Sequence, residues 1–289
     1  MNELALNQNI QSPAIITLTT DFGARDGFVG AMKGVILSIN PRAVIVDISH
    51  DIAPQQIAQG AFVLASAAPY FPARTIHVAV VDPGVGSARR PIALQIGETF
   101  FVAPDNGVLT LVCAKLKTPS PTLALPVENQ ESELGAVHLN RAEFWLPRVS
   151  RTFHGRDIFA PVAAHLSLGV PLAALGDPIH AWAQLALAEP YRAGDQICGQ
   201  VIYVDRFGNA ITNIGEVLLA GLERGRVGVR VAGRVLRGIA PTYVAVAPGE
   251  PLALVSSAEQ VEIAVRDGSA ADALGIRVGD AVTLSPGEC

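Results

Sequence analysis

The chain has few of the residues that mark a disulfide-rich, a nucleic-acid-binding or a membrane protein. Three of its 289 residues are cysteine, an odd number without short paired spacings, which indicates neither a disulfide framework nor a zinc site. The net charge of −5 argues against a general nucleic-acid surface, because phosphate binding relies on clustered lysine and arginine. The apolar stretch 61–71 is broken by Pro69 and is far shorter than the roughly 18 residues that span a bilayer. We therefore expect a cytoplasmic protein with no metal, nucleic-acid or membrane partner.

Half of the residues are hydrophobic and 16% are charged, so the chain can bury a substantial core. Its length predicts two domains, since single cores stop growing near ~250 to 300 residues. Residues 1–12 lack a basic region followed by an apolar core, and we interpret them as a frayed terminus and not as a secretion signal. A change of pattern around Pro190 places the boundary between a first domain at 13–185 and a second at 194–289.

The first domain is expected to be α/β. Short β-branched runs at 14–19, 44–48 and 75–81 alternate with segments of helical period, which is typical of a parallel sheet with crossover helices. This predicts a central, mostly parallel sheet with helices on both faces. Residues 117–133 have neither period and are expected to form a long connection with at most one edge strand.

Capping residues predict where the helices of this domain begin and end. The first helix is expected to start with Asp26 as its N-cap and to stop at Asn40, and the second to open at Pro54. Helical period returns at 155–168.

The second domain is expected to be a small antiparallel barrel or sandwich. Its short alternating segments lie at 199–204, 227–231, 235–239, 251–255, 260–265 and 281–284. Ala232 and Gly233 are predicted to form a hairpin tip.

Polar residues directly after an apolar strand are the first candidates for a site, because ligands collect at the carboxyl ends of parallel strands. Asp21 follows the first strand, where its carboxylate could accept two hydrogen bonds from a ribose-like diol. It could equally be a local cap at a strand-to-helix turn.

A second candidate is the loop that follows the strand at 75–81. Asp82 is succeeded by a glycine-containing turn and by Arg89 and Arg90, which could hold an anion or a polarised water. The loop lacks the Gly-Lys-Ser/Thr of a phosphate-binding loop, so nucleoside triphosphate hydrolysis is not indicated. A plain Pro-Gly turn with solvated arginines is the alternative.

Histidines supply the third candidate. His154 precedes a helix and could exchange a proton near neutral pH, although a loop histidine is more often structural. His50, between Ser49 and Asp51, is a rival that invites a metal interpretation, but no third spaced ligand accompanies it. His77 and His165 are interpreted as structural.

In the second domain, residues 205–213 are interpreted as a polar loop that interrupts a strand. Phe207 could stack on a flat heterocycle, and the Asn209 amide could pair with its edge. A hairpin bulge with an aromatic plug is the alternative. Asp105, which opens the string DNG, could likewise be only a helix N-cap.

Taken in order, these strings resemble the S-adenosyl-L-methionine (SAM) hydroxide adenosyltransferase family, relatives of the bacterial fluorinase and chlorinase. The matching strings are TTDFG at Thr19, VVDPGVG at Val80, APDNG at Ala103, FHGRD at Phe153 and DRFGNAITNI at Asp205. The resemblance runs nearly end to end. It implies an α/β domain followed by a β-barrel-like domain, and a trimer that binds SAM between the first domain of one subunit and the second domain of its neighbour.

The resemblance also implies residue roles. Asp82, Arg89 and His154 match the residues that activate water, and Asp21 matches the carboxylate that holds the ribose hydroxyls. Binding positions near the methionine and adenine ends of SAM correspond to Asp205, Phe207, Asn209 and Ser257. Ser257 lies in the string SSAEQ, which departs from the usual Asn-Ser-x-Gly-Tyr.

The implied reaction is attack of water on the ribose C5′ of SAM, giving adenosine and L-methionine, with SAM as substrate and no cofactor. A SAM-dependent halogenase is one alternative. The halogenases of the resembled family, however, have an uncharged residue in place of the Asp82 carboxylate, and fluorinase has a serine where this chain has Gly155. They also carry an extra loop before the APxNG string, whereas residues 96–99 join the two strands directly. A non-catalytic SAM or adenosine sensor is a second alternative, and a metal-dependent hydrolase built on His50 a third.

Overall fold

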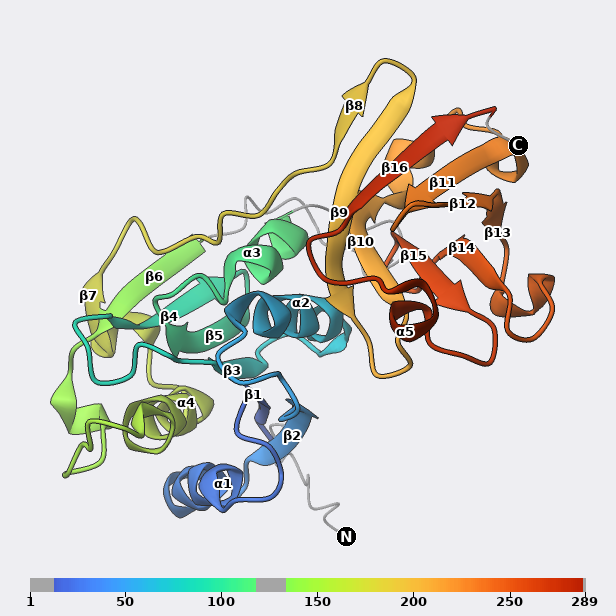
Figure 1. Cartoon of the computed structure of the whole chain (residues 1–289). Coiled ribbons are helices and arrows are strands. Elements are labelled where there is room, and N and C mark those ends of the chain that lie inside the picture. The colour runs from blue at the N-terminus through green and yellow to red at the C-terminus, as the bar shows by residue number, and fades with distance from the viewer. Residues whose placement is uncertain (1–12, 118–133, 288–289) are drawn as a thin grey trace, which may run out of the picture. The chain divides into compact units, whose positions relative to one another are not determined.

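The chain divides into two compact units, Met1–Leu185 and Ala186–Cys289. The computed structural model describes residues 13–117 and 134–287 (Figure 1). The division coincides with the end of the first predicted domain. The stretch between the two predicted domains, residues 186–193, belongs wholly to the second unit, where β8 (Tyr191–Ala193) pairs with β9 (Gln196–Val204).

The first unit is built on a mixed sheet with the strand order β2-β1-β3-β5-β4-β6-β7 among the described residues. These strands are β1 (Ile15–Thr20), β2 (Val44–Ser49), β3 (Ile76–Val80), β4 (Pro91–Ile96), β5 (Thr99–Pro104), β6 (Leu134–Leu139) and β7 (Gly176–Pro178). The first four in the spatial order are parallel, as predicted, and the remaining pairs are antiparallel. The direction changes because only Gly97 and Glu98 separate β4 from β5, and a parallel crossover needs a much longer connection.

Helices cover both faces of this sheet, as predicted. Alternate side chains of β3 point to opposite faces. Ile76, Val78 and Val80 join the core formed with α1 (Phe28–Ile39) and α4 (Ala160–Ser167). Ala79 joins the core formed with α2 (Ile57–Ala67) and α3 (Thr110–Lys117). A strand that is buried on both faces is mostly apolar, and this explains the largely β-branched run that marked β3 in the sequence, in which the buried His77 is paired with Thr17.

Two predicted helix starts are wrong. The N-cap of α1 is Gly27, which makes no side-chain capping hydrogen bond, so Asp26 does not cap the helix. Helix α2 begins at Ile57 and not at Pro54. Gln55 has a φ of 66°, outside the helical region, and this keeps the preceding residues in a turn.

The end predicted for the first helix is confirmed. Asn40 is the C-cap of α1, and its backbone N–H donates to the carbonyl of Ile36. The connection predicted at 117–133 lies, from residue 118 on, outside the described residues.

The second unit is a curled, almost entirely antiparallel sheet with the order β12-β11-β16-β9-β10-β15-β14-β13. The strands not yet bounded are β10 (Ala210–Gly215), β11 (Val227–Val231), β12 (Arg234–Arg237), β13 (Ile239–Ala240), β14 (Pro251–Val255), β15 (Gln260–Val265) and β16 (Ala281–Pro286), and a short helix α5 (Ala270–Leu274) precedes β16. Only Gly238 separates β12 from β13, which stand at opposite ends of this order. The sheet must therefore curl back on itself, and the predicted α/β plus antiparallel barrel-like fold is confirmed.

The sequence prediction for 205–213 is corrected in part. Residues 205–209 form a turn, but β10 begins at Ala210 and is a central strand between β9 and β15. Its Ala210, Ile211 and Ile214 are buried. Polar residues lie between these apolar ones, so the sequence did not show the unbroken or alternating apolar pattern of a strand.

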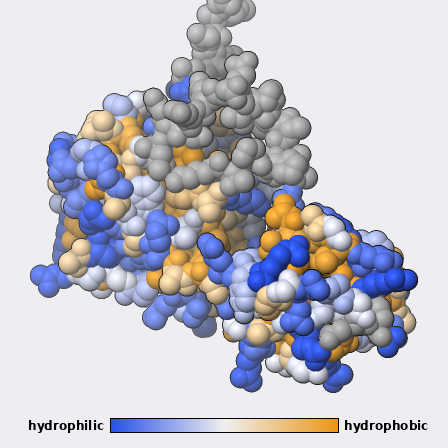
Figure 2. Space-filling view, turned by 90° about the horizontal axis from the view of Figure 1, so that it is seen from above, coloured by the Kyte–Doolittle hydropathy of each residue, from blue (hydrophilic) through white to orange (hydrophobic). Residues whose placement is uncertain are grey.

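Hydrophilic residues cover much of the visible surface, and hydrophobic residues reach it in patches (Figure 2). Within the described ranges, no helix combines the length and apolar character that a membrane crossing requires.

Candidate active site

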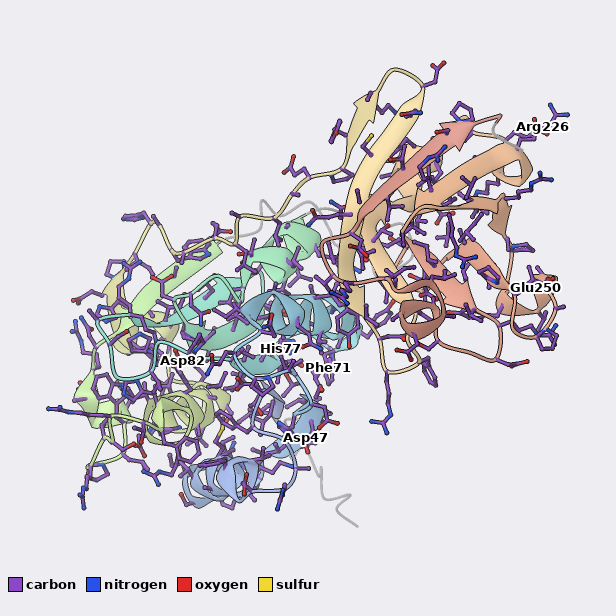
Figure 3. All side chains as sticks on the ribbon, in the orientation of Figure 1. Asp47, Phe71, His77, Asp82, Arg226 and Glu250 are labelled. Carbon is purple, nitrogen blue, oxygen red and sulfur yellow. The ribbon has the colours of Figure 1, made fainter. Side chains whose placement is uncertain are left out.

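Two acidic residues of the first unit lie at the same end of its sheet, just after the strands that carry them. Strands β1 and β3 are parallel neighbours, with Thr20 paired to Val80, so Asp21 and Asp82 follow the carboxyl ends of adjacent strands. Asp82 is drawn beyond the end of β3 in Figure 3. This end is where α/β sheets bind ligands.

The structure brings Asp82, Arg89 and His154 together. Arg89 Nε donates to both carboxylate oxygens of Asp82, at 2.9 and 3.0 Å, and Arg89 Nη2 also donates to Asp82 Oδ2. The same Nη2 lies 2.9 Å from His154 Nδ1. The guanidinium therefore links the loop after β3 to the segment that precedes α4.

This ion pair is buried. The side chains of Arg89 and Asp82 are 9% and 5% exposed, and the guanidinium carbon lies 5.2 Å from the centre of the Phe159 ring. Taking two charges out of water is costly, so such a pair is weak evidence for stability and is more informative about function. Among the described residues Arg89 Nη1 is buried without a hydrogen-bond partner. A buried donor needs an acceptor, and a water molecule can supply one.

The contact with Arg89 fixes the protonation of His154. A guanidinium can only donate, so Nδ1 of His154 must accept and the imidazole carries its proton on Nε2. Burial and the adjacent guanidinium lower the pKa of His154, and the carboxylates of Asp82 and Asp157 offset this only in part. The ring is therefore neutral near pH 7, and its one lone-pair nitrogen, Nδ1, faces Arg89.

Backbone contacts hold the two loops in place. Gly86 has a φ of 79°, and a Cβ built on it would lie 2.3 Å from the carbonyl oxygen of Arg151, so only glycine fits there. Asp157, which is fully buried, accepts hydrogen bonds from the Ser150 N–H at 2.7 Å and from Arg156 Nε at 2.6 Å. These bonds fold the 150–157 segment around His154.

Three supporting residues escaped the sequence prediction. Asn106 was considered only as part of the string DNG, a possible helix cap. Its side-chain amide in fact donates to the Val81 carbonyl at 2.8 Å, next to Asp82. Asp105 binds Arg90 Nε at 2.8 Å and accepts the Ala183 N–H, and it does not cap α3. The ring of Phe159 lies beneath the Arg89 guanidinium, and nothing in the sequence pattern pointed to this contact.

Asp21 is held by the loop that follows β2. Its Oδ2 accepts the backbone N–H of Gln55 at 2.8 Å, and the Gly23 N–H donates to the carbonyl of His50 at 2.8 Å. The carboxylate is part-exposed, so it remains accessible to a ligand.

The other histidines have the structural environments predicted for them. His77 is buried, with Nδ1 2.7 Å from Thr17 Oγ1. His165 packs edge-on against Phe144. Within 13–117 and 134–287, no group of three or more histidine, cysteine or acidic side chains is arranged to hold a metal ion.

In the second unit, Asp205 and Asn209 form one turn. Asp205 Oδ1 accepts the backbone N–H groups of Phe207 and Asn209, and Asn209 Nδ2 donates to Asp205 Oδ2 at 3.0 Å. The ring of Phe207 is 77% exposed, so it does not plug the hairpin. The turn presents an aromatic face beside a carboxylate.

A buried carboxyl stands near this turn. Glu262 on β15 accepts a hydrogen bond of 2.6 Å from the Tyr243 hydroxyl. Burial and then the charge of Asp205 raise the pKa of Glu262. Neither residue was singled out from the sequence, because a glutamate within an alternating strand usually indicates a solvated face.

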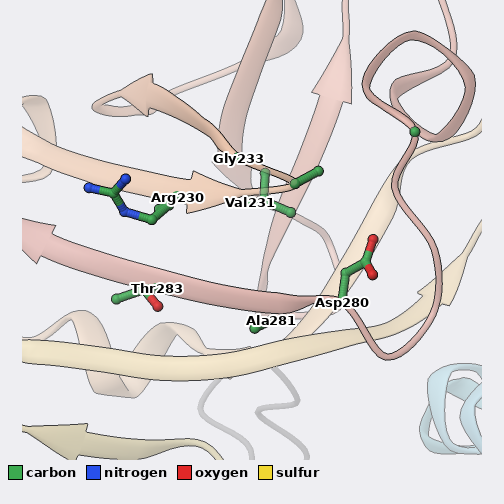
Figure 4. Close-up of a pocket in the computed structure, with 8 residues that line it drawn as sticks. Arg230, Val231, Gly233, Asp280, Ala281 and Thr283 are labelled. Carbon is green, nitrogen blue, oxygen red and sulfur yellow. The ribbon is translucent and has the colours of Figure 1, made fainter.

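Ser257 is not brought together with Asp205, Phe207 and Asn209. It is exposed in the turn between β14 and β15. In that turn the carbonyl of Glu259 accepts the backbone N–H of Glu216, which follows the end of β10. The Asp205 turn lies before the start of β10, at the other end of the strand. A surface pocket of this unit lies elsewhere. It is lined by residues that include Arg230, Asp280 and Thr283, none of them a predicted site residue (Figure 4).

The sequence and fold are similar to those of known proteins. The profile of the SAM hydroxide adenosyltransferase N-terminal domain matches residues 16–176, and that of the C-terminal domain matches residues 199–283. A protein from Salinispora tropica named (R)-S-adenosyl-L-methionine hydrolase is 42% identical over 275 residues, which cover 94% of this chain and 98% of the relative.

The fold has a counterpart among solved structures. The crystal structure of an uncharacterized conserved protein from Thermotoga maritima matches with a TM-score of 0.82 at 36% identity, covering 94% of this chain and 99% of that one. A fluorinase from Nocardia brasiliensis is more distant, 26% identical over 312 residues, which cover 94% of this chain and 97% of the relative. The chain belongs to the SAM hydroxide adenosyltransferase family.

Proposed function

We propose that the protein hydrolyses SAM to adenosine and L-methionine, through attack of a water molecule on the ribose C5′. The observation that carries the proposal is the buried contact of Arg89 with both Asp82 and His154. The name of the relative from Salinispora tropica supports the same substrate.

The charges in the cluster suit this reaction. A sulfonium leaves as a neutral thioether. As the attacking water gives up its proton, the hydroxide-like nucleophile and the cationic sulfonium neutralise each other in the transition state. A poorly solvated site favours that change, because it removes the hydration shell of the nucleophile and strengthens fixed dipoles. Aligning the water with C5′ contributes several kcal/mol, and up to roughly 7 to 11 kcal/mol in the best intramolecular cases. Arg89 orients the water, and Asp82 and His154 hold Arg89 and share the departing proton.

The substrate is held by groups from both units. Asp21 accepts hydrogen bonds from the ribose hydroxyls, and the Asp205 turn with Phe207 and Asn209 binds the methionine end and the adenine. We propose that a homotrimer assembles the site from the first unit of one subunit and the second unit of its neighbour. The 77% exposure of the Phe207 ring supports a role in contacting another molecule.

Halogenation is the closest rival. Asp82 neutralises the guanidinium of Arg89 and places a negative charge where a halide would need a positive one. A Cβ at Gly155 would lie 3.2 Å from Met32 Sδ and 3.3 Å from the Phe153 ring, so a serine there would be crowded. Both features favour water as the nucleophile.

Incubation of the purified protein with SAM in ¹⁸O-water tests the proposal. Hydrolysis at C5′ gives adenosine that carries the label on its 5′ oxygen, and this is the expected result. Unlabelled adenosine, methylthioadenosine or unchanged SAM would each contradict it. Unchanged SAM with measurable binding would instead support a sensor. A parallel reaction with EDTA tests whether turnover depends on a metal, and we expect the rate to be retained.

A further inference from the structure

His50 was highlighted in the sequence, but the proposed reaction does not use it, and its contacts are specific. Its side chain is 11% exposed and turns back from the end of β2 toward β1, where Nδ1 lies 2.8 Å from Thr20 Oγ1. Thr20 is fully buried and precedes Asp21. The imidazole therefore contacts the residue next to the carboxylate proposed to bind the ribose.

A carboxylate lies beside the other nitrogen of this ring. His50 Nε2 lies 3.0 Å from Asp47 Oδ1, and Asp47 Oδ2 accepts a hydrogen bond of 2.6 Å from Lys33 on α1. Asp47 stands on β2, at the edge of the sheet (Figure 3). A carboxylate beside Nε2 favours a proton on that nitrogen, which leaves Nδ1 to accept from the Thr20 hydroxyl.

The same contacts reach the backbone around Asp21. Thr20 Oγ1 accepts the N–H of Phe22 at 3.3 Å, and the carbonyl of His50 accepts the N–H of Gly23 at 2.8 Å. Residues 20 to 23 are thus tied to His50 on both sides of Asp21. In the loop that follows β2, the backbone N–H of Gln55 donates a hydrogen bond to the Asp21 carboxylate itself.

We propose that His50 is a positioning residue for Asp21, holding the 20–23 turn through Thr20 so that the carboxylate meets both hydroxyls of a vicinal diol. The proposal rests on the proposed function for the identity of the ligand, a ribonucleoside. Asp21 has one backbone hydrogen bond to its carboxylate, and its direction depends on the turn that carries it. A carboxylate that is displaced by a fraction of an ångström loses one of two simultaneous hydrogen bonds.

The test measures recognition of the diol and not activity alone. Calorimetry gives the Kd of adenosine and of 2′-deoxyadenosine for the wild-type protein and for the variants His50→Phe and Thr20→Val. We expect each variant to weaken adenosine binding by about tenfold, the scale of one lost hydrogen bond to a charged group. Binding of 2′-deoxyadenosine should change less than twofold in either variant, since that ligand already lacks the second hydroxyl. His50→Asn, which can keep an acceptor near Thr20, should recover much of the discrimination.

A double-mutant cycle with Asp21→Ala decides whether His50 acts through Asp21. In that background His50→Phe should no longer affect adenosine binding, because coupled residues are not additive. His165→Phe is the matched control, since it removes another part-buried imidazole of the same unit and should leave both affinities unchanged.

Several results would overturn the inference. These are additive effects of His50→Phe and Asp21→Ala, equal losses for the two nucleosides, or no binding of adenosine by the wild type. Thr20→Val replaces a buried hydroxyl by a methyl group of the same shape, so it remains informative if His50→Phe does not fold. Nucleoside binding is measured without turnover. Failure of SAM hydrolysis in labelled water therefore contradicts the proposed function and leaves this test intact.

Discussion

At the scale of single residues, Arg89 organises the site because one guanidinium serves both Asp82 and His154. Its Nε and Nη2 are committed to Asp82, and Nη2 also reaches His154. The geometry determines which states the neighbours can adopt, since Arg89 never gives up its proton. Removing Asp82 leaves the charge of the guanidinium unbalanced in a poorly solvated environment, and removing His154 takes away an acceptor for Nη2.

We expect Asp82→Ala and His154→Ala to lower SAM turnover by orders of magnitude, typical of positioned acid-base groups, while SAM still binds. Adenosine release by chromatography and a SAM Kd by calorimetry measure the two effects separately. Asp82→Ala leaves Arg89 as an unpaired buried charge, at a cost of about 3 to 5 kcal/mol, so Asp82→Asn should be tested beside it. The exposed Asp26 supplies the control Asp26→Asn, with unchanged turnover expected. Unchanged adenosine release in the Asp82 or His154 variants would refute their assignment.

His77 makes the stability of the protein sensitive to acid. Burial lowers the pKa of its imidazole to about 4, compared with 6.5 in an unfolded chain. Above about pH 6.5 both states are neutral, and between there and about pH 4 only the unfolded chain takes up the proton. Stability is therefore lost as the pH falls through this window, by about 3 kcal/mol for this residue.

Urea unfolding of the wild type and of His77→Phe at about pH 7 and about pH 4.5 measures this contribution. At the higher pH the variant should be less stable, because Thr17 loses its hydrogen-bond partner. At the lower pH the difference should shrink or reverse, because phenylalanine cannot be protonated. Carboxylates titrate in both proteins, so their effect cancels in the comparison, and a difference that does not vary with pH would show that His77 is not responsible.

At the scale of elements, the sequence predicted best where burial on both faces makes a strand a nearly unbroken apolar run. Strand β3 is recognisable because both of its faces are buried. Strand β10 was missed because Thr212 and Asn213 break its apolar run. Their side chains form hydrogen bonds that the sequence does not reveal. The Thr212 hydroxyl donates to the carbonyl of Val261, and the Asn213 side chain accepts the N–H of Gln200 and donates to the carbonyl of Ala188. The start of α2 was misplaced because it depends on a tertiary contact between Gln55 and Asp21.

The hairpin between β11 and β12 offers a test at this scale. Ala232 and Gly233 have φ angles of 47° and 73°, as in a type I′ turn, and alanine is strained there. We expect Ala232→Asn to stabilise the protein by about 0.5 to 1 kcal/mol, because asparagine tolerates this conformation. Ala232→Val should destabilise it, since a β-branched residue resists positive φ. Thermal unfolding of the pair measures both signs, and a shift in the same direction for both would contradict the turn assignment.

At the scale of the whole molecule, the candidate residues are divided between two units with separate cores. Asp21, Asp82, Arg89 and His154 belong to the first unit, and Asp205, Phe207 and Asn209 to the second. Strand patterns predicted both units, but the meeting of Asp82, Arg89 and His154 came only from the family resemblance. Spacing along a chain cannot show that residues 65 positions apart share a hydrogen bond.

Complementation tests whether a site is shared between subunits. Asp82→Asn and Asp205→Asn chains should each lack activity alone. Mixed in equal amounts, unfolded and refolded together, they should recover it at about a quarter of all sites, where an intact first unit meets an intact second unit from a different chain. The oligomer mass, measured by analytical ultracentrifugation, should correspond to three chains. A site formed within one chain would give no recovery, and a monomer would contradict the trimer directly.

The close approach of Gly86 to Arg151 has a consequence for how this protein can change over time. The segments that carry Arg89 and His154 meet there backbone to backbone, with room for a hydrogen atom and none for a methyl group. Natural variation can therefore alter many surrounding side chains and still keep Arg89 and His154 at hydrogen-bonding distance. A single added carbon at Gly86 would push the two segments apart.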